Sequence, residues 1–107
     1  MISIQDFKKV EMKTGKVLSV EDHPNADKLM VMRVDVGEER PRTLVAGLKD
    51  YYDADELEGM QIVVVTNLEP AQLRGVKSEG MLLAAQDGDD VVVLTLKQEL
   101  SPGSPVL

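Results

Sequence analysis

The residues best suited to bind another molecule gather between Asn67 and Ala85. Arg74 and Lys77 supply positive charge in this segment, Asn67 and Ser78 supply an amide and a hydroxyl, and two glycines lie among them. Cationic side chains donate charge-assisted hydrogen bonds to phosphate, and glycine lets an anion come close to the backbone. The segment therefore favours phosphate binding, and an ordinary solvated loop is the alternative.

Catalytic and metal-binding chemistry finds little support in the rest of the chain. The run Gly75–Ser78 lacks the second glycine directly before lysine that the phosphate-cradling loop of a nucleotide hydrolase requires. His23 is the only histidine, and with the carboxylates of Asp22 and Asp27 it could serve as a metal ligand or as the base of a hydrolase. One imidazole without thiolates cannot supply a zinc site, so His23 is interpreted as part of a structural turn. We expect no enzyme activity, no metal and no cofactor.

The charge of the chain permits only a local site for anions. The formal net charge is −7, which by itself disfavours nucleic acid as a partner. Nine of the 12 basic residues lie between Lys8 and Lys49, whereas residues 50–73 contain six acids and no base. An anion site must therefore combine Arg74 and Lys77 with basic residues from the first half of the chain.

Composition indicates one protein domain spanning residues 1–107. A chain of 107 residues with 43% hydrophobic residues can bury one core. The absence of cysteine excludes disulfides and thiolate metal sites. The first residues contain no long apolar run, so we expect neither a signal peptide nor a membrane span, and a cytoplasmic location.

The elements that must position the site are mainly strands. Lys28–Val36 is the clearest of them, because alternate residues are apolar and Arg33 falls on the outward face. A strand from Val10 to Val20 precedes it, with a bulge or bend expected at Gly15. The later strands are expected at Arg42–Ala46, Gln61–Thr66, Met81–Gln86 and Val91–Leu96, the last two forming a hairpin.

Two short helices are expected beside these strands. Ser3 and Asp6 form a capping pattern for a helical turn through Phe7, with Ile2 and Ile4 as further apolar anchors. Asp53 and Glu56 form a second such pattern, which predicts a helix over Asp53–Leu57. The Pro-containing and Gly-containing tail from Ser101 to Pro105 cannot continue a regular strand. The predicted fold is all-β: a five-stranded oligonucleotide-binding (OB) barrel with one or two short helices and a C-terminal extension.

Three sequence motifs of this chain resemble those of one known family. They are His23–Leu29 (His-Pro-Asn-Ala-Asp-Lys-Leu), Val45–Leu48 (Val-Ala-Gly-Leu) and the segment Asn67–Met81. Together they resemble the tRNA-binding domain at the C-terminus of methionyl-tRNA synthetases, which also occurs in stand-alone tRNA-binding proteins and in relatives of the endothelial monocyte-activating polypeptide. The resemblance covers Phe7 to Val106 and implies the OB barrel.

The resemblance also implies a set of tRNA-binding residues. The family's contact region corresponds here to Asn67, Arg74, Lys77, Ser78 and Met81. The two cations would hold phosphates, the amide and hydroxyl would supply neutral hydrogen bonds, and the methionine would contact a base or a partner subunit. From the neighbouring strands the groove could be extended by Lys28, Arg33 and Arg42.

This chain departs from the family pattern at two positions of the same segment. Glu69 stands where many members have lysine, and Gln72 stands where they have a basic residue. The segment has thus lost cations and gained an anion. Binding is therefore expected to be weak at physiological salt and to be lost as salt rises.

The resemblance implies partners as well as residues. We expect recognition of tRNA by shape, either as a stand-alone protein or as the C-terminal or beta appendix of an aminoacyl-tRNA synthetase for methionine. A homodimer would double the RNA contacts. Its seam is expected in Leu96–Leu107, which the barrel does not need, together with the segment before Val10. The alternative function is a protein-binding module like the secretion chaperones of similar fold, which the acidic surface favours.

Overall fold

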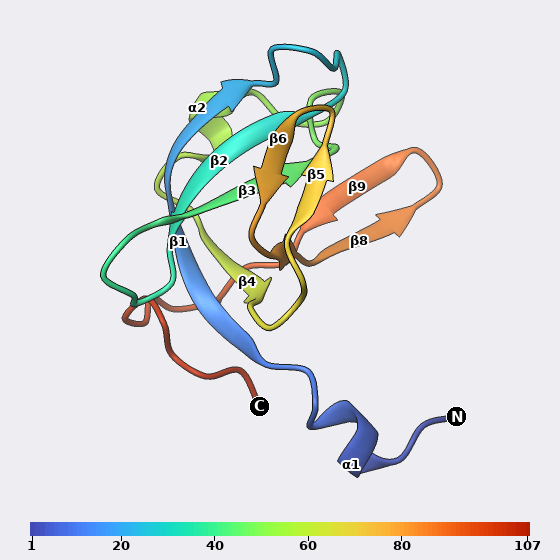
Figure 1. The fold of residues 1–107 in the computed structure, drawn as a ribbon, viewed down its shortest axis with the longest axis vertical. Helices are drawn as coiled ribbons and strands as arrows, with labels where there is room; N and C mark the ends of the chain where they lie inside the picture. Colours follow the sequence, from blue (N-terminus) through green and yellow to red (C-terminus); the bar gives the residue numbers. More distant parts are fainter.

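Nine strands and two single-turn helices make up the chain, and the computed structural model describes all residues 1–107 (Figure 1). The elements follow one another as α1 (Ile4–Phe7), β1 (Met12–Asp22), β2 (Met30–Asp35), β3 (Arg42–Ala46), α2 (Ala54–Leu57), β4 (Gln61–Val65), β5 (Ala71–Leu73), β6 (Val76–Ser78), β7 (Met81–Leu82), β8 (Ala84–Asp87) and β9 (Asp90–Val93).

An antiparallel sheet of five strands, in the order β3-β2-β1-β4-β7, curls into a nearly closed barrel. The long strand β1 makes this possible, because its first half pairs with β4 and its second half pairs with β2, around a shared Lys16. The barrel closes where the N–H of Glu79 donates to the carbonyl of Thr43 at 2.7 Å. The predicted all-β barrel is therefore confirmed.

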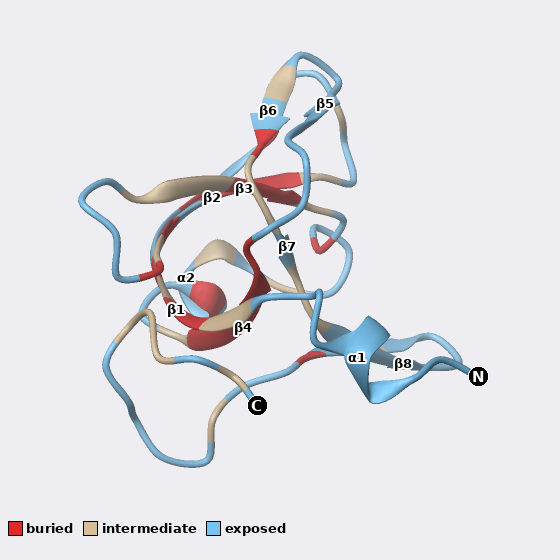
Figure 2. Cartoon of the chain, turned by 60° about the horizontal axis from the view of Figure 1, so that its bottom comes forward, coloured by how far each residue is buried: buried red, intermediate tan, exposed pale blue.

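The barrel interior is filled by aliphatic side chains and methionine. Met30, Met32, Val34 and Val36 of the β2 segment are at most 1% exposed, as their alternation predicts, and all five residues of β4 are buried. Helix α2 lies beside β1, framed by the barrel strands (Figure 2), and inserts a Leu57 that is 0% exposed. Its predicted capping pattern is present. The core thus follows from the hydrophobic pattern of the strands.

The irregularity of β1 lies beyond Gly15, and the predicted position of the bulge is wrong. The register of β1 against β2 slips between Val17 and Ser19, whereas Gly15 stays paired with Ile62 of β4. Glycine is required at position 15 for another reason: a Cβ atom there would lie 2.7 Å from Cγ1 of Val34. At Gly15 there is thus no room for a side chain between β1 and the core residues Val34, Val36 and Val64.

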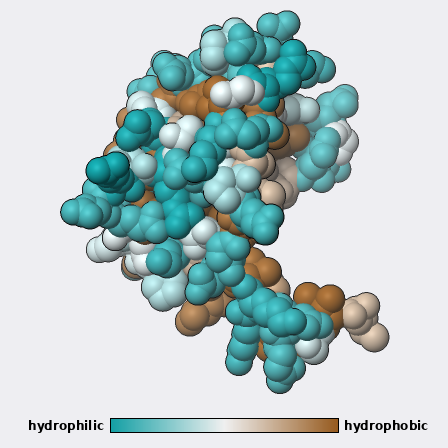
Figure 3. Space-filling view, viewed as in Figure 1, coloured by the Kyte–Doolittle hydropathy of each residue, from teal (hydrophilic) through white to brown (hydrophobic).

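The N-terminal helix forms as predicted, but its apolar residues are not anchors. The Ser3 hydroxyl accepts a hydrogen bond from the N–H of Asp6 at 3.1 Å and caps α1. Ile2, Ile4 and Phe7 nevertheless remain 71%, 59% and 42% exposed. Helix α1 stands away from the barrel (Figure 1), and hydrophobic side chains lie on the surface of this projection (Figure 3). Because the turn projects, it buries none of its residues.

The C-terminal tail is part of the barrel, contrary to the expectation that the barrel does not need it. The N–H of Val106 donates to the carbonyl of Met12, and Thr14 exchanges backbone hydrogen bonds with Gly103 and Ser104, all at 2.8–2.9 Å. The tail thereby covers the free edge at the start of β1. As predicted, Pro105 allows only an isolated bridge, to Lys13, instead of a regular strand.

The region after β4 has more strands than predicted. The expected strand Met81–Gln86 is split into β7, which pairs with β4, and β8, which pairs with β9. The predicted hairpin turn around Gly88 is present, but β9 ends at Val93. None of the helices has the length and apolar character needed to span a membrane.

Candidate functional site

The segment between β4 and β7 is a β-hairpin and not a loop. β5 and β6 pair from Ala71↔Ser78 to Leu73↔Val76, and the two residues between them are Arg74 and Gly75. Both have positive φ, 53° and 92°, which is the combination that a tight hairpin turn requires. Arginine rarely adopts this conformation, so the contacts around the turn must hold it there. The hairpin stands above the barrel, with most of its surface exposed (Figure 2).

A buried histidine fastens this hairpin to the loop that follows β1. His23 is 6% exposed, and its Nε2 lies 2.9 Å from the carbonyl of Leu73. The N–H of Asn25 donates to Nδ1 of the same ring at 2.9 Å. Since a carbonyl can only accept, the proton of the neutral ring lies on Nε2. The structural interpretation of His23 is consistent with these contacts, but its partner on β5, 50 residues away, is not apparent in the sequence.

Contacts between Asn25 and Arg74 complete this clamp. Nη2 of Arg74 donates to the carbonyl of Asn25 at 3.3 Å, and Nδ2 of Asn25 donates to the carbonyl of Arg74 at 3.5 Å. Both distances are long, and both residues are exposed. The guanidinium is therefore directed by weak contacts and keeps most of its donors for another partner.

The predicted cations fall into two groups. Arg74 and Lys28 line the same shallow hollow of about 390 Å³, and Lys77 lies exposed on β6 of the same hairpin. Arg33 and Arg42 instead line a separate polar hollow, where Glu38, Glu39 and Glu79 also lie. The structure thus brings Arg74 and Lys28 to one hollow and Arg33 with Arg42 to another, while Lys77 lines neither.

The Arg42 side chain is engaged within the chain. Its guanidinium donates two hydrogen bonds of 2.8 Å to the carboxylate of Glu38. Nη1 also donates to the carbonyls of Thr66 at 2.6 Å and Glu79 at 3.0 Å. The hydrogen bonds to Glu38 raise the pKa of Arg42, and the pKa of Glu38 is held below its ordinary value of 4.5. Arg42 therefore joins β3 to the ends of β4 and β6.

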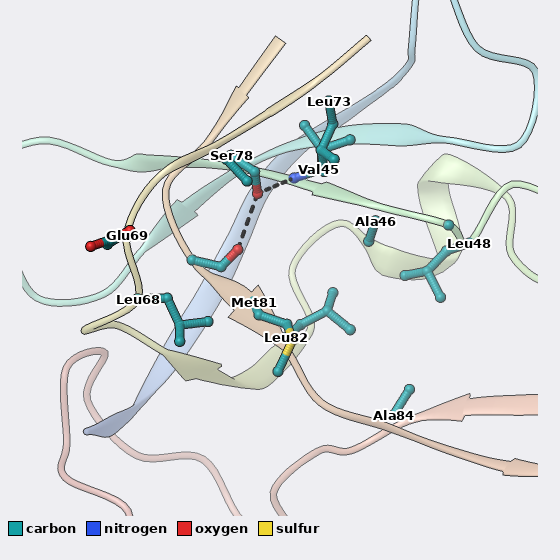
Figure 4. A pocket seen from close by; sticks show the side chains of 13 residues that line it. Val45, Ala46, Leu48, Leu68, Glu69, Leu73, Ser78, Met81, Leu82 and Ala84 are labelled. Atoms are coloured by element: carbon teal, nitrogen blue, oxygen red, sulfur yellow. Dashed lines mark hydrogen bonds between the residues drawn. The ribbon is translucent and has the colours of Figure 1, made fainter. Parts of the chain in front are cut away.

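Ser78 and Asn67 also use their side chains internally. Ser78 is 5% exposed, and its hydroxyl accepts from the N–H of Val45 and donates to the carbonyl of Gly80, both at 3.0 Å (Figure 4). This pair of bonds lies where the barrel closes. The Asn67 amide bonds to the segment before β1, accepting from the N–H of Glu11 at 2.8 Å and donating to the carbonyl of Lys9 at 2.6 Å. Neither role was visible in the sequence, because every partner except Gly80 is distant along the chain.

An apolar groove of about 470 Å³ lies between the hairpin, β3 and β7. Its wall includes Leu48, Leu68, Leu73, Met81 and Leu82, whose side chains surround the hollow in Figure 4. Leu68, Leu73 and Met81 are 46%, 37% and 49% exposed. Met81 was expected from the sequence to offer apolar contact. The rest of the groove forms only when the hairpin folds over β3.

Comparison with protein families gives one match, which covers most of the chain. The model of a family described as a putative tRNA binding domain matches residues 12–105. Methionine–tRNA ligase of Pyrococcus horikoshii is 50% identical over 105 residues, which are 98% of this chain and 14% of that protein. The corresponding ligase of Thermotoga maritima is 48% identical over 98% of this chain and 16% of its own length. The chain thus spans about one seventh of these relatives.

Two solved structures of similar fold match this chain over its full length. A MetRS related protein from Pyrococcus horikoshii superposes with a TM-score of 0.92 at 34% identity, covering 100% of this chain and 98% of that one. The chaperone CsaA of Bacillus anthracis superposes with a TM-score of 0.89 at 30% identity, covering 100% and 99%.

Proposed function

Because the chain belongs to the tRNA-binding domain family, we propose that it is a non-catalytic module that binds tRNA with the face around the β5–β6 hairpin. The observation that carries the proposal is the turn residue Arg74, whose guanidinium extends from a clamped, left-handed backbone position. Because the backbone of the turn is already held, binding a phosphate costs only the freedom of the Arg74 side chain. Lys28 lines the same hollow as Arg74, and Lys77 adds an exposed charge on the same hairpin.

The proposed contact is weak, and recognition depends on shape. Gln72 lies opposite Lys77 in the hairpin register. Many relatives have a basic residue at this position, whereas glutamine adds no charge. Three or four phosphate contacts give a slope of roughly −2 to −4 in log K against log salt. With a net charge of −7, the remaining surface repels the polyanion. Binding is thus expected at low salt and is lost steeply as salt rises.

The predicted binding residues divide into contact and positioning residues under this proposal. Arg74, Lys77 and Lys28 contact phosphates, Arg33 adds charge from the separate polar hollow, and Met81 offers apolar contact. We assign Asn67, Ser78 and Arg42 to positioning, because their polar atoms are already bonded within the chain. Their substitution is expected to act through the stability of the barrel.

A homodimer is part of the same proposal. A hollow of about 380 Å³ between α1 and the C-terminal tail is lined by Ile4, Phe7, Val10, Val106 and Leu107. Exposed apolar residues on a projecting element are typical of a surface that another subunit covers. A second copy seated there would double the cations available to one tRNA. The native mass with and without tRNA tests this part, and a monomer in both states would contradict it.

The relatives are much longer than this domain, which favours a domain that is attached to a synthetase. The matching segment is 14% of the methionine–tRNA ligase of Pyrococcus horikoshii. We therefore propose that the domain assists an aminoacyl-tRNA synthetase, in cis or as a separate subunit. Such a module works in the cytoplasm, where the synthetase meets tRNA.

A filter-binding titration with bulk tRNA tests the function. Replacing Arg74 or Lys77 by alanine should weaken binding and reduce the magnitude of the salt slope by about one for each phosphate that the variant no longer neutralises. Lys97→Ala is the matched control, since Lys97 is an exposed cation outside the hairpin and should bind tRNA like the unmodified chain. Absence of tRNA retention even at low salt would refute the proposal.

Binding of unfolded polypeptide is the second candidate function. The apolar groove and the structural similarity to the chaperone CsaA favour it. Converting both Arg74 and Lys77 to alanine separates the two functions, because apolar peptide binding should survive the loss of these charges while tRNA binding should not.

A further inference from the structure

We propose that the apolar groove beside the hairpin takes one unstacked base of the bound RNA, and that it does so without distinguishing the four bases. The inference rests on the tRNA-binding function proposed above. It starts from three large apolar side chains, Leu68, Leu73 and Met81, which face one hollow and stay 37–49% exposed. The hollow of about 470 Å³ lies within the usual range of small-ligand pockets, roughly 300–1,000 Å³.

The groove and the cations belong to the same hairpin, and this juxtaposition points to RNA. Leu73 lines the groove and directly precedes Arg74, and Lys77 directly precedes Ser78, another lining residue. Because neighbouring side chains of a strand point to opposite faces, Lys77 lies on the face of β6 away from the groove, and Arg74 at the turn is the hairpin cation next to its mouth. An RNA strand whose phosphate is held at Arg74 therefore passes the mouth of the groove. Glu69 is the only charged residue of the lining, and its carboxylate points away from the hollow (Figure 4). The carboxylate therefore does not face a base that enters the groove.

The lining explains why base identity is not read. The chain has three aromatic residues, Phe7, Tyr51 and Tyr52, and none of them lines the groove, so the base packs against leucine and the thioether of Met81. The polar side chain at the floor, Ser78, already donates to Gly80 and accepts from Val45. Its donor is therefore not free to select a base edge.

A base can enter only from RNA in which it is unstacked. Bases in a regular duplex are stacked and face inward, whereas bases of loops and bulges can be splayed onto a protein surface. The groove should therefore favour folded tRNA over a plain duplex of equal length, even though both offer phosphates to Arg74 and Lys77. This preference is a form of shape recognition that charge alone cannot supply.

Thiol protection tests the occupancy of the groove directly, because the chain contains no cysteine. Met81→Cys places one thiol in the groove, and Leu18→Cys is a matched control at 49% exposure outside it. We expect saturating tRNA to slow alkylation by N-ethylmaleimide about tenfold or more at position 81 and to leave position 18 unchanged. A perfect RNA duplex should protect neither. Leu68→Cys repeats the test from a loop position if the variant at β7 fails to fold.

Affinity measurements separate this inference from the proposed function. Leu68→Ser and Met81→Ser should weaken tRNA binding by about five- to tenfold without changing the salt slope, whereas Arg74→Ala should reduce the slope. If the unmodified chain binds no tRNA, both proposals fail. If it binds tRNA while thiols at positions 81 and 68 react at unchanged rates, only the groove inference fails. It also fails if the duplex protects equally well, or if an unfolded polypeptide protects position 81 and tRNA does not.

Discussion

Replacement of His23 by leucine should lower both the free energy of unfolding of the domain and its affinity for tRNA. The substitution removes the Nε2–H that donates to the carbonyl of Leu73 and the Nδ1 that accepts from the N–H of Asn25, each at 2.9 Å. Loss of a partner costs about 1–3 kcal/mol for a buried polar group. Because Leu73 is 37% exposed and Asn25 is exposed, water can replace part of each bond. We therefore expect a loss of about 1–2 kcal/mol in the free energy of unfolding.

Thermal and urea unfolding measure this loss, at roughly 4–8 °C in Tm for each kcal/mol in a domain of this size. His23→Gln is the matched control, because its amide can still donate toward Leu73, and it should recover part of the stability. An unfolding midpoint for His23→Leu equal to that of the unmodified chain would refute the reasoning, since it would mean that the clamp contributes nothing.

The effect on RNA tests whether His23 acts through Arg74. Release of β5 should let the turn move, so His23→Leu should weaken tRNA binding under conditions where the variant is fully folded. In an Arg74→Ala background the same change should have little further effect, because the group that it positions is gone. Fully additive losses of affinity in this double-mutant cycle would show that His23 does not position Arg74.

Three further predictions concern the barrel. Ser78→Ala removes the hydroxyl that bridges two backbone groups at the closure, so urea unfolding should show a loss of about 2–3 kcal/mol, with an unchanged salt slope for tRNA binding. Gly15→Ala should cost about 1–3 kcal/mol in the same assay, because its Cβ would lie 2.7 Å from Val34. The pKa of Glu38 is lowered by its hydrogen bond to Arg42, so its modest contribution to stability is present above pH 4.5 and is lost as pH falls through the lowered value. Glu38→Gln should flatten that part of the curve of Tm against pH.

Local patterns in the sequence determine most of the elements. The alternation of β2 predicts its buried face, and the capping patterns at Ser3 and Asp53 predict both helices. These signals are local, because side-chain period and capping depend on residues within one or two turns of each other. The barrel follows from them, since strands with one apolar face must close around a shared core. The family motifs add the identity of the fold and of the RNA-binding segment.

The tertiary structure decides what the individual side chains in that segment can do. Arg42, Asn67 and Ser78 have the chemistry of phosphate or base contacts, but folding brings backbone groups 24, 58 and 33 residues away within their reach, and their polar atoms are used there. The same long-range packing joins His23 to β5, moves the C-terminal tail onto β1 and forms the apolar groove between β3 and the hairpin. Such contacts depend on how separate elements meet in space, which no periodicity along the chain records. The sequence therefore determined the family, most of the barrel strands and the available charges, and only the tertiary structure separated the free cations from the engaged ones.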